Sequence, residues 1–229
     1  MTNIPKHIGI IVDGNRRWAK SRKLPTFYGH KKGYAKLKDV ADWCFDYGIE
    51  VLTCYVFSNE NWERSKKEVS YLMKLLKQAL TTEINELQKR DIRLKICGKI
   101  DDMRLSKDLR KAIIEAQEKT KNNKRGILNL ALNYGGRKEI VEAVKKIVKS
   151  KTKIQSINEK TIEQYLWTAG LPELDLIIRT SEKRLSGFLL WQSAYSELFF
   201  INKYWPDFTK ADLIKVLKEY DQRQRRYGQ

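Results

Sequence analysis

The sequence predicts an α/β protein built on a six-stranded, mostly parallel sheet with helices on its faces. Six apolar segments rich in β-branched residues recur along the chain, and helical stretches separate them. These segments are residues 8–12, 51–57, 92–97, 127–133, 174–178 and 198–201. No internal repeat, low-complexity tract or Pro/Gly-rich linker divides the chain, so we expect one domain over residues 1–229.

Composition indicates a globular protein with an anionic partner. Hydrophobic residues make up 41% and charged residues 32%. No apolar run approaches the ~20 residues of a membrane span, and we expect no signal peptide. The net charge of +18 favours nucleic acid, an acidic membrane surface or phosphorylated small molecules as partners. Cys44, Cys54 and Cys97 form no C-x-x-C pattern and indicate buried free thiols in a reducing cytosol. Two histidines argue against a multi-histidine metal site.

The first predicted strand ends in polar residues. Asp13 and Gly14 form a sharp turn, and Asn15 can cap the helix that carries Arg16 and Arg17. Ligands of open α/β sheets bind at the carboxyl ends of the strands, so a carboxylate and two guanidinium groups lie where a ligand would bind. An ordinary strand-turn-helix with a capping asparagine explains the same residues equally well.

Two further strand ends carry polar groups. Residues 58–64 follow the second strand, and residues 179–186 after the fifth combine arginines with hydroxyl groups, as a diphosphate requires. Glu197 starts the last strand, where an acid is a paired charge, a metal ligand or a surface charge. The recurrence at strand ends predicts one composite site, in which Asp13 and Glu197 would ligate Mg²⁺.

A long apolar helix follows the second strand. Ser65 and Glu68 form a capping-box pattern before it. Its apolar face is core, or the wall of an elongated cavity, and spacing does not separate the two. That face comprises Val69, Leu72, Met73, Leu76, Leu80, Ile84 and Leu87, widened by Leu75 and Ala79. Gly135 and Gly136 at a later helix start allow close approach of an anion, and the P-loop and dinucleotide-binding glycine patterns are absent.

Five ordered motifs resemble the cis-prenyltransferases, with bacterial undecaprenyl diphosphate synthase as the closest type. The motifs are DGNRRW at 13–18, GHKKG at 29–33, FSNENWER at 57–64, NYGGR at 133–137 and LLWQ at 189–192 with Glu197. The resemblance implies the family's α/β fold, with an apolar tunnel under two helices. It also implies a homodimer that condenses isopentenyl diphosphate onto an allylic diphosphate, usually farnesyl diphosphate. Undecaprenyl diphosphate, the lipid carrier precursor for cell-wall glycans, is the expected product, and a shorter cis-prenyl chain is the alternative.

The same resemblance implies the site residues. Asp13 would hold Mg²⁺ together with Glu197, and Asp13 and Asn61 would be catalytic, with Asn61 in the deprotonation step. The implied substrate-binding residues are Gly14, Asn15, Arg16, Arg17, Trp18 and His30 around the allylic diphosphate; Ser58, Asn59, Glu60, Trp62 and Arg64 beside it; Arg179, Arg184, Leu185 and Ser186 around isopentenyl diphosphate; and Arg226 and Gly228, reaching the partner subunit.

Several positions depart from the family pattern. The loop at 179–186 is one residue shorter than usual and lacks a glycine, and Gly187 stands where Asn is common. Thr26 replaces a basic residue, for which Lys23 or Lys31 could compensate. Val56 stands where long-chain enzymes have a smaller residue, which would narrow the tunnel mouth and shorten the product.

Two other functions fit parts of the sequence. A nucleic-acid-binding domain would explain the charge and the exposed aromatics, but no RRM, KH or helix-turn-helix pattern occurs. A non-catalytic prenyltransferase subunit would lose the first motif, whereas Asp13 and Glu197 are both present. We therefore expect a cytoplasmic enzyme that does not bind nucleic acid. Peripheral contact with the anionic inner face of the membrane is a further hypothesis, because the product is apolar and the protein basic.

Overall fold

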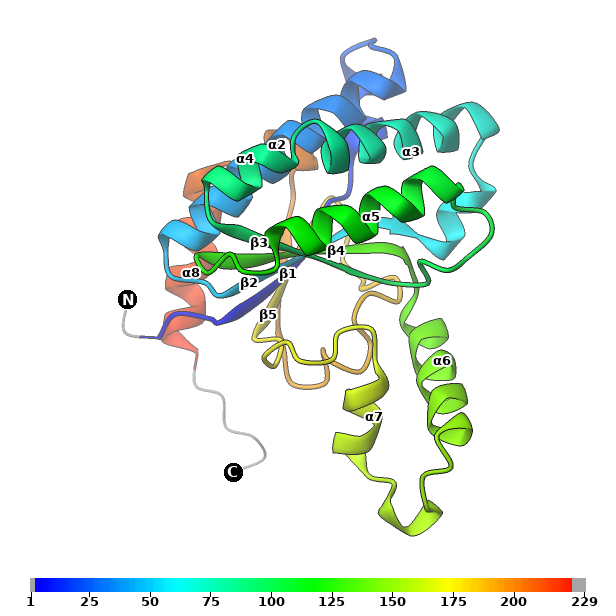
Figure 1. Ribbon diagram of the computed structural model, residues 1–229. Helices are drawn as coiled ribbons and strands as arrows, with labels where there is room; N and C mark the ends of the chain where they lie inside the picture. Colours follow the sequence, from blue (N-terminus) through cyan, green and yellow to red (C-terminus); the bar gives the residue numbers. More distant parts are fainter. Residues whose placement is uncertain (1–2, 224–229) are drawn as a thin grey trace.

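The computed structural model describes residues 3–223, in which six strands form one parallel sheet (Figure 1). The strands are β1 (His7–Ile11), β2 (Val51–Ser58), β3 (Ile92–Cys97), β4 (Gly126–Tyr134), β5 (Leu176–Thr180) and β6 (Glu197–Ile201). Their spatial order is β3-β4-β2-β1-β5-β6, and every neighbouring pair is parallel. The predicted fold class and all six predicted strands are confirmed. The fifth begins later than predicted, because the Asp175 carboxylate accepts hydrogen bonds from the amides of Lys6 and His7.

Helices cover both faces of the sheet. They are α1 (Asn15–Ser21), α2 (Thr26–Asp46), α3 (Lys66–Thr81), α4 (Ile84–Lys89), α5 (Lys107–Thr120), α6 (Gly136–Lys149), α7 (Glu159–Tyr165) and α8 (Lys210–Gln222), with 3₁₀ turns η1 (Asn59–Glu63), η2 (Ile154–Ser156) and η3 (Trp205–Asp207). Helices α2 to α5 lie over one face, and α6 and α7 form an arm on the other side (Figure 1). No helix within residues 3–223 is long and apolar enough to span a membrane.

The strands are apolar on both faces, as expected for a parallel sheet covered on both sides. Ile10, Leu52 and Leu130 belong to the larger core cluster, which also contains residues of α2, α5 and α8. Tyr55 and Phe188 belong to a smaller cluster on the other face. Side chains along each strand thus point alternately into these two clusters, and the polar groups of the site lie at the ends of the strands.

The predicted long apolar helix is divided into α3 and α4. Helix α3 begins at Lys66, because the Ser65 hydroxyl accepts a hydrogen bond from the Glu68 amide at 3.3 Å. It ends at Thr81, and α4 resumes at Ile84. Leu80 and Ile84 on either side of the break are both buried, so the apolar face continues across it.

Helices α1 and α2 pack in direct backbone contact. A Cβ atom on Gly29 would lie 2.0 Å from the carbonyl oxygen of Asn15, and one on Gly33 would lie 2.1 Å from the Asn15 side-chain oxygen. Only glycine permits this approach. The contact holds the start of α1, with its two arginines, against the helix that carries His30.

Candidate active site

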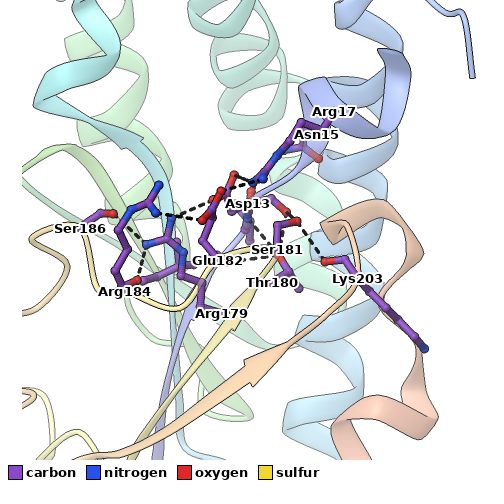
Figure 2. Close-up of polar contacts among 12 residues, drawn as sticks. Asp13, Asn15, Arg17, Arg179, Thr180, Ser181, Glu182, Arg184, Ser186 and Lys203 are labelled. Carbon is purple, nitrogen blue, oxygen red and sulfur yellow. Dashed lines mark hydrogen bonds and ion pairs between the residues drawn. The ribbon is translucent and has the colours of Figure 1, made fainter. Parts of the chain in front are cut away.

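The carboxyl ends of β1 and β5 meet at Asp13. Ile11 is in register with Arg179, so the residues that follow each strand are neighbours. The Thr180 hydroxyl donates to the carbonyl oxygen of Asp13 at 2.7 Å and accepts from its amide at 3.1 Å. These bonds fix the backbone at Asp13, and its carboxylate faces the arginines of both strand ends (Figure 2).

Arg179 is a buried cation with an unused donor. Its guanidinium donates to Asp13 Oδ2 and to the Ser186 hydroxyl, both at 2.8 Å, and to the carbonyl oxygen of Arg184. Its Nε finds no hydrogen-bond acceptor among residues 3–223. A buried donor without an acceptor is costly, so this position suits a bound anion.

Arg17 and Arg184 extend this positive region. Arg17 lies 3.3 Å from Asp13 and 2.7 Å from Glu182, and Arg184 lies 2.9 Å from the other oxygen of Glu182. The hydrogen bond from Arg17 and the charge of Arg184 lower the pKa of Glu182. We call Asp13, Arg17, Arg179, Glu182 and Arg184 the arginine clasp. Three guanidinium groups against two carboxylates leave a net positive charge, and guanidinium groups are well suited to binding phosphate oxygens.

Gly14, not Asn15, is the N-cap of α1, so the capping prediction for Asn15 is wrong. Gly14 has φ 104°, and a Cβ there would lie 2.4 Å from the Ser181 hydroxyl. Asn15 is the first helical residue, and its side-chain oxygen is buried without a donor in the part of the chain that the structure describes. This orphan acceptor lines the cavity described next.

An apolar cavity of about 710 Å³, including its open mouth, lies between α2, α3 and the sheet, and Val12 and Asn15 on either side of Asp13 and Gly14 belong to its lining. Its lining is Val12, Asn15, His30, Gly33, Tyr34, Leu37, Val56, Phe57, Leu72, Met73, Leu75, Leu76, Ala79, Leu130, Leu132 and Trp205. A second cavity of about 670 Å³ continues toward α4 and shares Tyr34, Leu37, Ala79 and Leu130 with the first. The α3 face therefore lines an elongated cavity as well as packing on the core, and both readings of that face are confirmed.

Glu68 at the cavity mouth was not predicted as a site residue. Its Oε1 accepts from Arg64 at 3.0 Å and lies 3.0 Å from His30 Nε2, while Arg16 lies 3.8 Å from Oε2. Burial lowers the pKa of His30, so a neutral ring can donate its Nε2 hydrogen to Glu68. In the sequence, Glu68 was explained by the capping-box pattern alone. Its spacing of four residues from Arg64 was the one sequence feature that indicated an ion pair.

The motifs at 57–64 and 133–137 lie side by side. Asn61 closes η1, because its side-chain oxygen accepts from the amide of Ser58 at 3.2 Å. Trp62 donates to the side chain of Asn133 at 2.8 Å, and the Arg104 guanidinium lies 4.8 Å from the Trp62 ring. Asn59 accepts from Lys138 at 3.3 Å. These contacts hold the segment after β2 against the start of α6.

Comparison with known proteins decides the family. The family model described as "Putative undecaprenyl diphosphate synthase" matches residues 11–228. This chain belongs to the undecaprenyl diphosphate synthase family. The predicted resemblance is confirmed, and the site belongs to a cis-prenyltransferase.

Relatives within the family span nearly the whole chain. A Micrococcus luteus protein named ditrans,polycis-undecaprenyl-diphosphate synthase, farnesyl-diphosphate specific, is 46% identical over 98% of this chain and 92% of its own length. A Pyrococcus furiosus tritrans,polycis-undecaprenyl-diphosphate synthase, geranylgeranyl-diphosphate specific, is 44% identical over 98% and 87%. The crystal structure of lavandulyl diphosphate synthase from Lavandula x intermedia in complex with dimethylallyl diphosphate has a TM-score of 0.93 and 37% identity, covering 99% of both chains.

Glu197 lies far from Asp13 in this family member. Glu197 pairs with Leu176 and Leu176 with Ile8, so Glu197 is level with Ile8, five residues before Asp13. Strand rise makes that about 16 Å along the sheet. The two carboxylates of one chain are therefore too far apart to ligate one ion together. Glu197 instead pairs with Arg223, and its role as a metal ligand stays a prediction that requires a second subunit.

The other predicted site residues fall into four groups. Trp18 donates to Asp207 at 2.7 Å and stacks on Arg22, which joins α1 to η3 and gives Trp18 a structural partner outside the arginine clasp. Ser186, with φ 49°, closes the shortened loop through its bond to Arg179, and Leu185 packs on the smaller core cluster. Glu60 is exposed on η1. Arg226 and Gly228 lie outside the described residues.

Proposed function

We propose that this enzyme condenses isopentenyl diphosphate onto farnesyl diphosphate and extends the chain to undecaprenyl diphosphate. One observation carries the proposal: Val12 and Asn15, which flank Asp13 and Gly14 in the chain, line an elongated apolar cavity next to the arginine clasp. A charged head and a long apolar tail are the two halves of an allylic diphosphate. The names of the relatives, both undecaprenyl diphosphate synthases, support the product, while they differ in the allylic starter.

The chemistry requires charge stabilisation at one end and exclusion of water at the other. The allylic C1–O bond breaks and diphosphate leaves with the electron pair. C4 of isopentenyl diphosphate then bonds to C1, and a proton leaves C2. Arg17 and the amides at the start of α1 would stabilise the departing diphosphate, and Arg179, Arg184 and Ser186 would hold isopentenyl diphosphate. The cavity wall would keep water from the allylic cation. The proton would leave next to Asn61 and the released diphosphate.

Mg²⁺ is the proposed cofactor, and Asp13 is suited to hold it. The Asp13 side chain is 30% exposed, and its two oxygens each lie against a guanidinium group, Oδ1 against Arg17 and Oδ2 against Arg179. Mg²⁺ typically takes one or two carboxylates and completes its shell with water and phosphate oxygens. Residues 3–223 contain no cluster of three or more His, Cys, Asp or Glu, so substrate oxygens would supply part of the shell. When bound, the ion would neutralise charge on the diphosphate.

A homodimer is the proposed assembly. Leu198 and Phe200 are each 37% exposed on the same face of β6, the edge strand of the sheet. Val141, Val144 and Val148 form an exposed stripe on α6. Apolar surface on an edge strand is normally covered. Because Glu197 starts the same strand, such an interface would bring it close to a second subunit. Sedimentation velocity would measure this, and a monomer at micromolar concentration would contradict it.

One assay tests the reaction. The protein is incubated with Mg²⁺, labelled isopentenyl diphosphate and either farnesyl or geranylgeranyl diphosphate, and the products are sized. We expect long chains from farnesyl diphosphate; absence of any condensation would contradict the proposal. Asp13→Asn should reduce turnover by roughly a hundredfold or more, since charge stabilisation of a leaving group is worth that much. Asp101→Asn, on an exposed side chain, is the matched control and should behave as the wild type.

A further inference from the structure

Residues 14–38, which we call the basic hairpin, carry an unusual concentration of charge. They contain nine Lys and Arg and no Asp or Glu. The chain average, 46 basic and 28 acidic residues in 229, would give about five and three in such a segment. Arg16, Arg17, Arg22 and Lys38 pair with acids on other segments, and Lys36 pairs with Asp39 one turn further along α2. Lys20, Lys23, Lys31 and Lys32 are exposed and make no ion pair with any residue from 3 to 223.

The turn of the basic hairpin also exposes large apolar side chains. Leu24, Phe27 and Tyr28 are 39%, 44% and 45% exposed, and the Phe27 and Tyr28 rings stack with centroids 4.7 Å apart. Lys31 is four residues from Phe27 on α2, so the two share a face. In Figure 1 this turn, in dark blue, projects beyond the helical layer at the top of the molecule. Unpaired lysines therefore surround an aromatic and aliphatic tip.

This tip lies at the mouth of the apolar cavity. Helices α2 and α3 wall the cavity, and His30, one turn after Phe27, lines it. The Phe27 ring lies 5.8 Å from the ring of Tyr71 on α3, and the Tyr71 hydroxyl donates to the carbonyl oxygen of Phe27 at 3.4 Å. The exposed aromatics thus sit on the seam between the two helices that enclose the cavity.

We propose that the tip of the basic hairpin docks on a membrane surface of anionic lipid. Lysines attract the anionic headgroups, while Leu24, Phe27 and Tyr28 enter the boundary between headgroups and acyl chains. Nucleic acid would use the lysines equally well but would leave Leu24 exposed, so the apolar content favours lipid. Docking would present the seam between α2 and α3 to the membrane, where an apolar chain leaves the cavity. That last benefit rests on the proposed function, and docking itself does not.

Co-sedimentation with vesicles tests the docking. Full-length protein is mixed with vesicles of phosphatidylcholine alone, or of phosphatidylcholine with phosphatidylglycerol. The tip variant is Lys20→Gln, Lys23→Asn and Phe27→Ser; asparagine is chosen because Lys23 has φ 54°, which asparagine tolerates. The control variant is Lys107→Gln, Lys124→Gln and Ile114→Ser. It removes the same charge and a side chain that is 63% exposed, from α5 and the loop before β4.

The wild type should bind the phosphatidylglycerol vesicles and release them as salt rises. The tip variant should bind them roughly 30-fold more weakly from its two lysines alone, and the control should bind as the wild type does. Equal loss in both variants, equal binding to neutral vesicles, or no vesicle binding would overturn the proposal. So would tighter binding to an oligonucleotide than to vesicles with the same loss in the tip variant. Vesicle binding without condensation would reject only the proposed function, and condensation without vesicle binding would reject only the docking.

Discussion

Replacing Tyr34 with alanine should lengthen the product, because this side chain lies where the two halves of the apolar cavity meet. Tyr34 lines both cavities, and its hydroxyl donates to Glu83 at 2.8 Å, which also accepts from Lys38 at 2.8 Å. Glu83 lies in the break between α3 and α4. The tyrosine therefore lies between α2 and this break, at the junction of the first cavity beside α3 and the second cavity beside α4.

The size of the effect follows from the helix that lines both cavities. The first cavity follows α3 from Leu72 to Ala79, seven residues or about 10 Å. The second cavity continues from Ala79 to Leu87 on α4, eight residues or about 12 Å. Removing the ring would join the two cavities and lengthen the apolar path by about 12 Å. The products of Tyr34→Ala should therefore carry more isoprene units than those of the wild type. Because Tyr34 is half-buried, its loss should cost about 2 kcal/mol of stability, less than a fully buried aromatic.

The assay compares product lengths from labelled isopentenyl diphosphate for wild type, Tyr34→Ala and Tyr34→Phe. Phenylalanine keeps the ring and loses only the hydrogen bond to Glu83, so its products should match those of the wild type. If Tyr34→Ala turns over normally and yields the same lengths, the ring does not limit the chain. If Tyr34→Phe lengthens the product as much as alanine does, the hydrogen bond and not the ring closes the path.

Two further predictions concern a buried histidine and the arginine clasp. Burial lowers the pKa of His7 from 6.5 to about 4. Between these pH values the unfolded chain binds a proton that the native state does not. The free energy of unfolding should therefore decrease by about 3 kcal/mol as the pH is lowered from 6.5 to 4, because a pKa difference of one corresponds to about 1.36 kcal/mol. Urea unfolding of wild type and His7→Gln across this range measures it, and parallel curves would contradict the assignment. Arg179→Lys keeps the charge but cannot reach Asp13 and Ser186 together, so KM for isopentenyl diphosphate should rise roughly tenfold to a hundredfold. An unchanged KM in steady-state assays would remove Arg179 from that pocket.

The sequence predicts the sheet and the convergence of its polar ends for a simple physical reason. Apolar runs identify the strands locally, and the carboxyl ends of parallel strands all lie on the same side of the sheet. Asp13 and Arg179, which are 166 residues apart, therefore meet without any further information. The same rule places Glu197 with the amino ends of the strands, on the side of the sheet away from Asp13, because Glu197 is the first residue of β6. A metal site shared by Asp13 and Glu197 therefore requires Glu197 to come from a second subunit.

Side-chain partners across elements are less predictable. Nothing local indicates that Glu68 faces His30 from another helix or that Tyr34 reaches Glu83 at a helix break. Both depend on how closely α2 approaches α3, and tertiary packing sets that distance. The break itself has no Gly or Pro to announce it, and the weak helix propensity of Thr81 and Thr82 does not by itself end a helix. Cavity shape is therefore the property that required the structure.

The charged and apolar halves of the site come from different layers of the fold, and this separates their functions. The arginine clasp belongs to α1, the end of β5 and the adjoining loops, where Asp13 and Glu182 hold three mutually repelling guanidinium groups together. Such pre-arranged charge needs little reorganisation when negative charge develops. The cavity belongs to α2, α3 and α4, which contribute no arginine to the clasp. Substitutions in the clasp should therefore change turnover and KM while leaving product length unchanged. Substitutions at Tyr34 should change product length while leaving KM for isopentenyl diphosphate unchanged.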